Sequence, residues 1–186
     1  MNHTVHHDRH GLHPAVVGAF LHWWERISRD SAGGLDKADR AVLRRCATPT
    51  AVACTGAYQR VYHAMLAAHE GPPWTSWQQD RLAALVGLAA HIKRSSNRSL
   101  PQEMHQHPEG GERNRVSELR FKRLLESPDV DSLFTGLRRV LPLIEHQVDL
   151  ASMASDLFRW NDAVRKRWAY AYYDTAPARA GEQTAV

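Results

Sequence analysis

Residues 76–94 read SWQQDRLAALVGLAAHIKR, and this stretch decides the fold class. Its apolar side chains recur at intervals of three and four residues, which is the period of an α-helix and not the alternation of a strand. The turn sequence EGPP at residues 70–73 precedes it. The stretch therefore predicts a long helix that packs one apolar face into a core, with these inward positions: Leu82, Leu85, Val86, Ala89 and Ile92.

The same helical period continues on both sides of this stretch. We expect helices over 15–29, 36–47 and 49–69 before it, and over 116–126, 129–146 and 149–173 after it, the last with a break at 161–162. No segment alternates apolar and polar residues in the manner of a strand. We therefore predict an all-α protein with seven to eight helices in two helical-bundle lobes joined by a long loop.

The domain organisation follows from where the helical pattern stops. Residues 95–115 combine serines, Pro101, Pro108 and a Gly-Gly step, which is typical of a functional or mobile loop. We expect an N-terminal lobe over 14–94, this loop over 95–115 and a C-terminal lobe over 116–173. Residues 1–13 read as a disordered lead-in, and 174–186 as a flexible tail.

Composition excludes several protein classes. The chain has 186 residues, of which 43% are hydrophobic, and this is enough for one domain or two small lobes. No run approaches the roughly 18 apolar residues of a membrane span, and the polar N-terminus lacks the apolar core of a secretory signal. We expect a soluble, cytoplasmic protein without membrane contact. Two cysteines cannot form a disulfide framework, so Cys46 and Cys54 are expected to be small buried thiols.

Signatures of catalysis and of metal or cofactor binding are missing from the sequence. It has no phosphate-binding glycine loop, no nucleophile elbow, no H-E-x-x-H and no C-x-x-C. Twelve histidines are many, but several crowd the N-terminal lead-in, where a rigid second shell for a metal is not expected. A hydrolase that uses His63 or His91 has no supporting motif. We predict no enzyme activity, no cofactor and no metal site.

The charge is unevenly distributed along the chain. The net charge is only +4, yet residues 37–62 hold five basic residues against one acidic residue, and residues 81–123 hold nine against four. Residues 124–137 hold three acidic residues and no basic one. Arginine far outnumbers lysine, and its guanidinium contacts phosphate bidentately and stacks on bases. Clustered arginine favours a surface that binds a polyanion, although a solvated helix face is the common alternative.

The first basic island gives the clearest candidate surface. Lys37, Arg40 and Arg44 are spaced i, i+3 and i+7, so a helix would present them on one face.

Among the tryptophans, Trp74 follows two prolines and is the one that we least expect to be buried. The full set of candidate nucleic-acid-binding residues is Lys37, Arg40, Arg44, Arg45, Lys93, Arg94, Arg98, Arg120, Arg123, Arg139, Arg165 and Lys166.

Four short motifs follow one another along the chain: FLHWW at 20–24, DRAVLRRCATP at 39–49, RFKRLL at 120–125 and LFRW at 157–160. Together they resemble the CasB family, the small subunit of the type I-E CRISPR surveillance complex Cascade. The similarity runs from about residue 20 to residue 173, and the 95–115 segment is variable. Each motif is short, but their order and spacing together make the match fairly specific.

The resemblance implies an all-helical protein without catalytic activity. Two copies would lie head to tail in the complex, contacting guide RNA, both strands of the target DNA, the backbone subunits and the large subunit. It places Arg40, Arg44 and Arg45 at the nucleic acid in the first lobe, Arg120 and Arg123 in the second, and Arg165 and Lys166 in the last helix. Asp162 and Ala163 depart from the more basic pattern expected there. The alternative is a helical scaffold whose basic face binds acidic protein partners.

Overall fold

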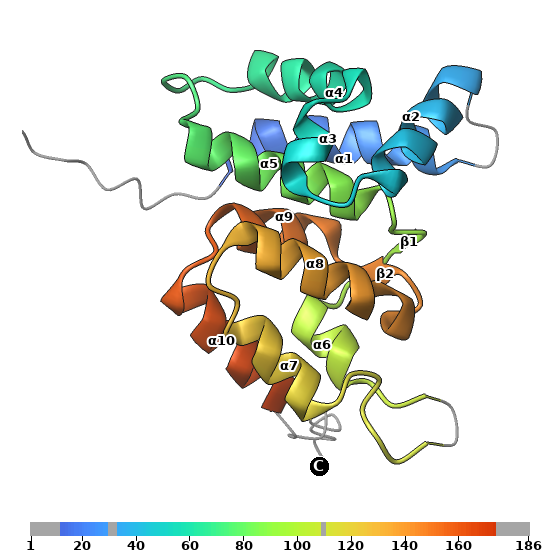
Figure 1. The fold of residues 1–186 in the computed structure, drawn as a ribbon, viewed down its shortest axis with the longest axis vertical. Helices are drawn as coiled ribbons and strands as arrows, with labels where there is room; N and C mark the ends of the chain where they lie inside the picture. Colours follow the sequence, from blue (N-terminus) through green and yellow to red (C-terminus); the bar gives the residue numbers. More distant parts are fainter. Residues whose placement is uncertain (1–11, 30–32, 109–110, 174–186) are drawn as a thin grey trace, which may run out of the picture.

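The computed structural model describes residues 12–29, 33–108 and 111–173. Within these residues it contains ten α-helices, one 3-10 helix and a single pair of two-residue strands (Figure 1). The all-α class is confirmed, with more helices than the seven to eight predicted. The predictions for the tail at 174–186 and for most of the lead-in, residues 1–11, fall outside the described residues.

The α-helices follow one another as α1 Pro14–Ser28, α2 Gly34–Arg45, α3 Pro49–Ala53, α4 Gly56–Ala67, α5 Ser76–Ala89, α6 Leu100–His105, α7 Glu118–Leu125, α8 Val130–Val140, α9 Leu150–Phe158 and α10 Asp162–Tyr173. The 3-10 helix η1 covers Leu141–Ile144, and strands β1 (Arg94–Ser95) and β2 (Gln147–Val148) pair in parallel. Polar side chains that accept a backbone N–H begin many of the helices, as helix capping requires. They are Thr48, Thr55, Thr75, Asp129 and Asp149.

Helix α5 lies at the centre of the molecule. The five positions predicted to face inward are all buried, and the burial extends further, to every residue from Arg81 to Ala90. Helices α2, α3 and α4 contact it from one side, and α8 and α9 contact it from the other (Figure 1). A Cβ on Gly87 would lie 2.7 Å from Val52 and 2.9 Å from Phe134. Glycine at this position leaves room for α3 and α8 to meet against the helix at the same point.

Residues 95–115 are not the structureless loop that we predicted. Strand β1 pairs Arg94 with Gln147 at their start, and α6 follows. Ser99 and Gln102 cap the beginning of α6 with a reciprocal pair of hydrogen bonds, a local signal that favours a helix there. Helix α6 packs against α10 and thereby ties this segment to the end of the chain. The buried apolar residues form one continuous cluster that includes those of α5, so the core shows no boundary between two lobes. The division into lobes therefore stays a prediction.

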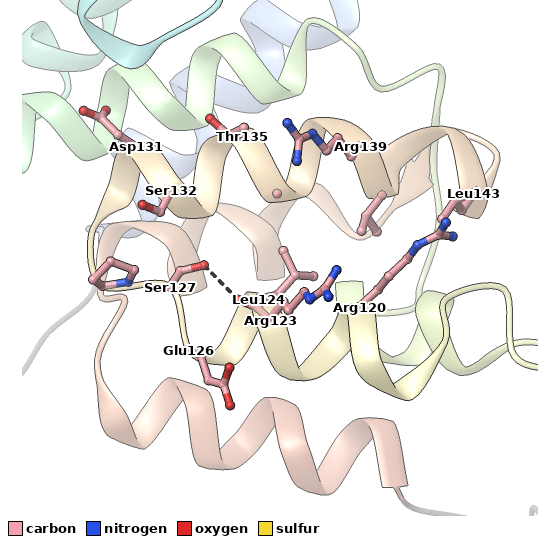
Figure 2. A pocket seen from close by; sticks show the side chains of 13 residues that line it. Arg120, Arg123, Leu124, Glu126, Ser127, Asp131, Ser132, Thr135, Arg139 and Leu143 are labelled. Carbon is pink, nitrogen blue, oxygen red and sulfur yellow. Dashed lines mark hydrogen bonds between the residues drawn. The ribbon is translucent and has the colours of Figure 1, made fainter.

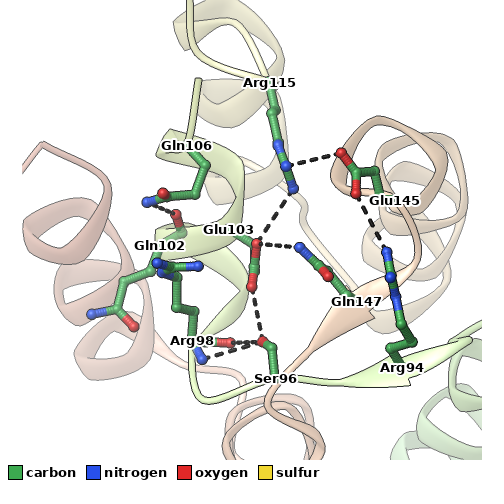
Figure 3. Close-up of polar contacts among 9 residues, drawn as sticks. All are labelled: Arg94, Ser96, Arg98, Gln102, Glu103, Gln106, Arg115, Glu145 and Gln147. Carbon is green, nitrogen blue, oxygen red and sulfur yellow. Dashed lines mark hydrogen bonds and ion pairs between the residues drawn. The ribbon is translucent and has the colours of Figure 1, made fainter. Parts of the chain in front are cut away.

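A buried carboxylate organises the connection between β1, α6 and β2 (Figure 3). Glu103 has no exposed surface, accepts a hydrogen bond of 2.8 Å from Ser96 Oγ and another of 3.3 Å from Gln147 Nε2, and pairs with Arg115 at 3.5 Å. Arg115 also pairs with Glu145 at 2.9 Å. A buried charge is tolerated only when it is paired and hydrogen-bonded, and this network meets both conditions.

One helix, the two cysteines and Trp74 differ from prediction. The helix expected over 49–69 is interrupted at Thr55, whose hydroxyl accepts the N–H of Tyr58 at 3.0 Å and starts α4. Cys46 is half-buried and Cys54 is exposed, so the prediction of two buried thiols was wrong. The expectation for Trp74 was also wrong, because Tyr62 and His69 pack on its ring and leave it only 5% exposed. The tryptophan at the surface is Trp77, which is 52% exposed.

Candidate nucleic-acid interface

The first basic cluster lies on α2. Lys37 and Arg44 are exposed, and with half-buried Arg40 they help line a hollow of about 380 Å³ between α2 and the end of α1. Arg40 turns its guanidinium inward and donates to the carbonyls of Ala90 at 3.0 Å and Ile92 at 2.6 Å. These carbonyls follow the last turn of α5, where a helix leaves acceptors without an internal partner. Arg40 therefore holds α2 against the end of α5 as well as contributing charge.

The second cluster lies in a cleft between α7 and α8. Arg120 and Arg123 on α7 and Arg139 on α8 line it, and Figure 2 shows the three side chains toward one end of the cleft. The cleft has a volume of about 830 Å³. Its opposite end holds Glu126 and Asp131. The three arginines make this cleft a candidate anion site at one end only.

Two consecutive arginines of α8 connect the clusters. Arg139 points into the α7–α8 cleft, whereas Arg138 turns toward α2 and donates to the carbonyl of Arg44 at 3.3 Å. Successive residues on a helix point about 100° apart, so one adjacent pair can serve two surfaces. Arg138 was not in our candidate set. The sequence shows that Arg138 and Arg139 are adjacent. Only the packing of α8 against its neighbours shows that the two side chains face different clusters.

Two histidines were also missed as part of the basic surface. His91 follows α5, and burial lowers its pKa to about 4, helped by the nearby positive charges of Arg138 and Arg44. Burial likewise lowers the pKa of His146, and Lys93 and Arg44 act in the same direction. In the sequence these histidines had no recognisable partner, because residues 91 and 146 meet only through the fold.

The remaining predicted residues do not line either hollow. Lys93, Arg45, Arg98 and Lys166 are exposed. Arg94 pairs with Glu145 at 3.5 Å (Figure 3). Arg165 is half-buried on α10, where it donates to the carbonyl of Ser127 at 2.8 Å and pairs with Asp162 at 3.1 Å. These contacts occupy the charged groups of Arg94 and Arg165 within the protein, while the clusters on α2 and α7–α8 leave Lys37, Arg44, Arg120 and Arg123 open to solvent.

Among residues 12–29, 33–108 and 111–173, histidine, cysteine and carboxylate side chains do not gather in groups of three or more that could ligate a metal. No helix in this part of the chain combines the length and the apolar character needed to cross a membrane.

Comparison with solved structures gives several matches. A Cse2-family protein from Thermus thermophilus aligns with a TM-score of 0.62 and 27% identity, covering 85% of this chain and 97% of its own. CasB from M. ruber aligns with a TM-score of 0.61 and 25% identity, covering 86% and 93%. A chain in the crystal structure of E. coli Cascade bound to a PAM-containing dsDNA target has a TM-score of 0.63 and covers 82% and 92%, but at 21% identity it shows the fold alone.

Sequence comparison gives the family directly. No curated protein matches the chain significantly. The family model described as CRISPR-associated protein Cse2 matches residues 39–173, which is most of the chain and includes both basic clusters apart from Lys37. This match agrees with the motifs at 39–49, 120–125 and 157–160 that first indicated CasB. The chain belongs to the CRISPR-associated Cse2 family, whose members are also called CasB.

Proposed function

We propose that this chain is a non-catalytic small subunit of a type I-E Cascade complex that binds nucleic acid through its basic face. One observation carries the proposal: cations on α2, α8 and α7 form a series in which α8 reaches both of the other helices. Arg138 of α8 donates to the backbone carbonyl of Arg44 on α2, and the next residue, Arg139, shares a cleft with Arg120 and Arg123 of α7. In Figure 1 these three helices follow one another down the molecule. A polyanion can lie along such a series and contact each cluster in turn.

The physical role of the basic face is to bind phosphates irrespective of base sequence. Guanidinium groups that neutralise phosphates release counterions, so the affinity falls steeply with salt. Phosphate contacts carry no sequence information, which suits a complex whose specificity comes from guide pairing. Formation of an R-loop exchanges one duplex for another of similar stability, so backbone contacts can tip the balance. We propose that the subunit stabilises the guide RNA–target DNA R-loop in this way.

The acidic end of the α7–α8 cleft limits the path of the nucleic acid. Glu126 and Asp131 would repel phosphates there, while Arg120, Arg123 and Arg139 attract them at the other end. The polyanion should therefore leave the cleft on the arginine side and continue past Arg138 toward α2. The surfaces outside this path remain for protein contacts, which we propose are with the Cascade backbone and large subunits and with a second copy of this chain, in the cytoplasm.

Binding of labelled single-stranded and duplex oligonucleotides at several salt concentrations tests the proposal. Arg44→Ala with Arg123→Ala should weaken binding and lower the slope of log affinity against log salt by about 0.7 for each phosphate of a single strand that is no longer neutralised. Exposed Arg113→Ala, outside the series, is the matched control and should bind as the wild type does. R-loop stability in the reconstituted complex should fall with the double variant alone.

Two results would contradict the proposal. Unchanged affinity and unchanged R-loop stability in the double variant would show that this face does not contact nucleic acid. A wild-type protein that lacks salt-dependent binding to either kind of strand, yet assembles with its protein partners, would instead support the scaffold that binds acidic proteins.

A further inference from the structure

Residues from both halves of the chain meet in a compact basic group beside α5. We call Arg44, His91, Lys93, Arg138 and His146 the junction cluster. His91 and Lys93 follow α5, Arg44 lies near the end of α2, and Arg138 lies on α8. The backbone brings the two histidines together, because the N–H of Lys93 donates to the carbonyl of His146 at 2.8 Å.

The position of His146 depends on an unusual backbone turn. Glu145 and His146 have φ angles of 58° and 56°, in the left-handed region that residues other than glycine rarely adopt. The N–H of His146 donates to the carbonyl of Leu141 at 2.9 Å and holds the turn closed. Two successive residues in this region carry a conformational cost, which the surrounding contacts must offset. The turn brings His146 beside the end of α5.

The charges that act on the two histidines are all positive. Burial lowers the pKa of His91, and the charges of Arg138, Arg44 and Arg40 lower it further. Burial also lowers the pKa of His146, with the charges of Lys93, Arg44 and Arg40 acting in the same direction. A backbone contact to His91 raises the pKa of His146 and partly opposes these effects. Arg40 is already bonded to backbone carbonyls. The adjacent carboxylate, Glu145, pairs with Arg94 and Arg115 instead. The cluster thus concentrates positive charge without a carboxylate partner of its own.

The histidine rings also contain nitrogen atoms without partners. Nε2 of His91 and Nδ1 of His146 are buried and make no hydrogen bond. Protonation of His91 would add a charge beside the existing cations at a buried nitrogen that has no partner, and the backbone contact to His91 only partly offsets the same cost for His146. The free protein therefore keeps this pair of histidines neutral. A bound anion would remove both obstacles, since it supplies acceptor oxygens and negative charge.

We propose that the junction cluster is a phosphate subsite that binds one phosphodiester group of the nucleic acid together with a proton taken up by the His91–His146 pair. This inference rests on the function proposed above and specifies one contact on the same face. Arg44 and Arg138 supply the permanent charge, and a small side-chain rearrangement lets a phosphate oxygen accept from the protonated ring. His91, His146 and Arg138 thereby become binding residues beyond the predicted set.

Proton uptake gives the subsite a measurable signature. An anion raises the pKa of an adjacent histidine, so nucleic acid binds more tightly as the pH falls from the pKa of the bound state toward that of the free state. Each proton taken up strengthens binding by at most about tenfold per pH unit in that window. Because the two rings lie together, the protons belong to the pair.

The experiment measures affinity and proton uptake for the full chain with a labelled single-stranded oligonucleotide. Anisotropy titrations from pH 8 to pH 5 at constant ionic strength are compared for the wild type, for His91→Asn with His146→Asn, and for exposed His22→Asn as the control. Calorimetry in two buffers of different ionisation enthalpy counts the protons bound. NMR titration of the wild-type histidines, free and bound, needs no variant and covers the case in which the double variant folds poorly.

The expected result is a steeper rise in affinity on acidification for the wild type and for His22→Asn than for the double variant. NMR should show two histidines whose pKa rises on binding. Two results would overturn this subsite: equal proton uptake in the wild type and the double variant, or no rise of a histidine pKa in the NMR titration. The proposed function would stand in either case, provided that binding still depends on salt. Absence of salt-dependent binding at every pH would overturn the proposed function itself and this subsite with it.

Discussion

Arg40→Ala should destabilise the fold far more than removal of a neighbouring arginine does. The side chain makes two close hydrogen bonds to the carbonyls of Ala90 and Ile92, both of which are buried residues. A hydrogen bond to a charged group contributes about 1.5–3 kcal/mol, and the lower value suits a half-buried guanidinium. Loss of both bonds should lower the free energy of unfolding by about 3 kcal/mol. For a chain of this size the melting temperature should then fall by about 6–12 °C.

Urea denaturation followed by tryptophan fluorescence, together with thermal melting, measures this change. Arg44→Ala is the matched control, since its side chain is exposed on the same helix, and it should change stability by less than about 0.5 kcal/mol. Arg40→Lys should fall between the wild type and Arg40→Ala, because an ammonium cannot reproduce the planar fork. If Arg40→Ala unfolds within about 0.5 kcal/mol of the wild type, the guanidinium does not hold α2 to α5.

Two further predictions concern the centre of the fold. Gly87→Ala should lower the free energy of unfolding, measured by urea denaturation, by about 1–3 kcal/mol, because the new Cβ would lie 2.7 Å from Val52 and 2.9 Å from Phe134. Gly18→Ala on α1 is the control, since the added Cβ meets open space there and should not destabilise the protein. Equal stability of the two variants would contradict the packing around Gly87. The pKa of His91 lies near 4 in the folded protein, below its ordinary value of 6.5, so its contribution to stability is full above pH 6.5 and is lost as the pH falls toward 4. Denaturation at a series of pH values should show a smaller acid loss for His91→Asn than for the wild type, and equal losses would rule out this contribution.

Local patterns predicted much of the secondary structure. The helical period of residues 76–94 identified α5, which begins at Ser76. The same reasoning missed α6, because a six-residue helix has too few turns to show a period. It also missed the break at Thr55, where a residue that reads as continuing the helix instead caps the next one. Short elements depend on individual hydrogen bonds, which a period does not reveal.

The candidate surface was predictable only in outline. The basic islands pointed to α2 and α7, and the structure leaves Lys37, Arg44, Arg120 and Arg123 exposed there. Arg40 shared their spacing, yet its guanidinium turns toward the carbonyls after α5. Helical spacing gives the direction in which a side chain leaves the helix, but the neighbours it then meets belong to segments about fifty residues away.

The sequence by itself determined the helical class, the family and the presence of arginine-rich segments. These properties follow from i to i+4 contacts and from residue order, which do not depend on how helices pack. The tertiary structure decided that α5 is buried on all sides from Arg81 onward, that Arg138 and Arg139 connect two basic clusters, and that His91 meets His146 among cations. Each of these depends on contacts between distant segments, and such contacts exist only after the helices have packed around one core.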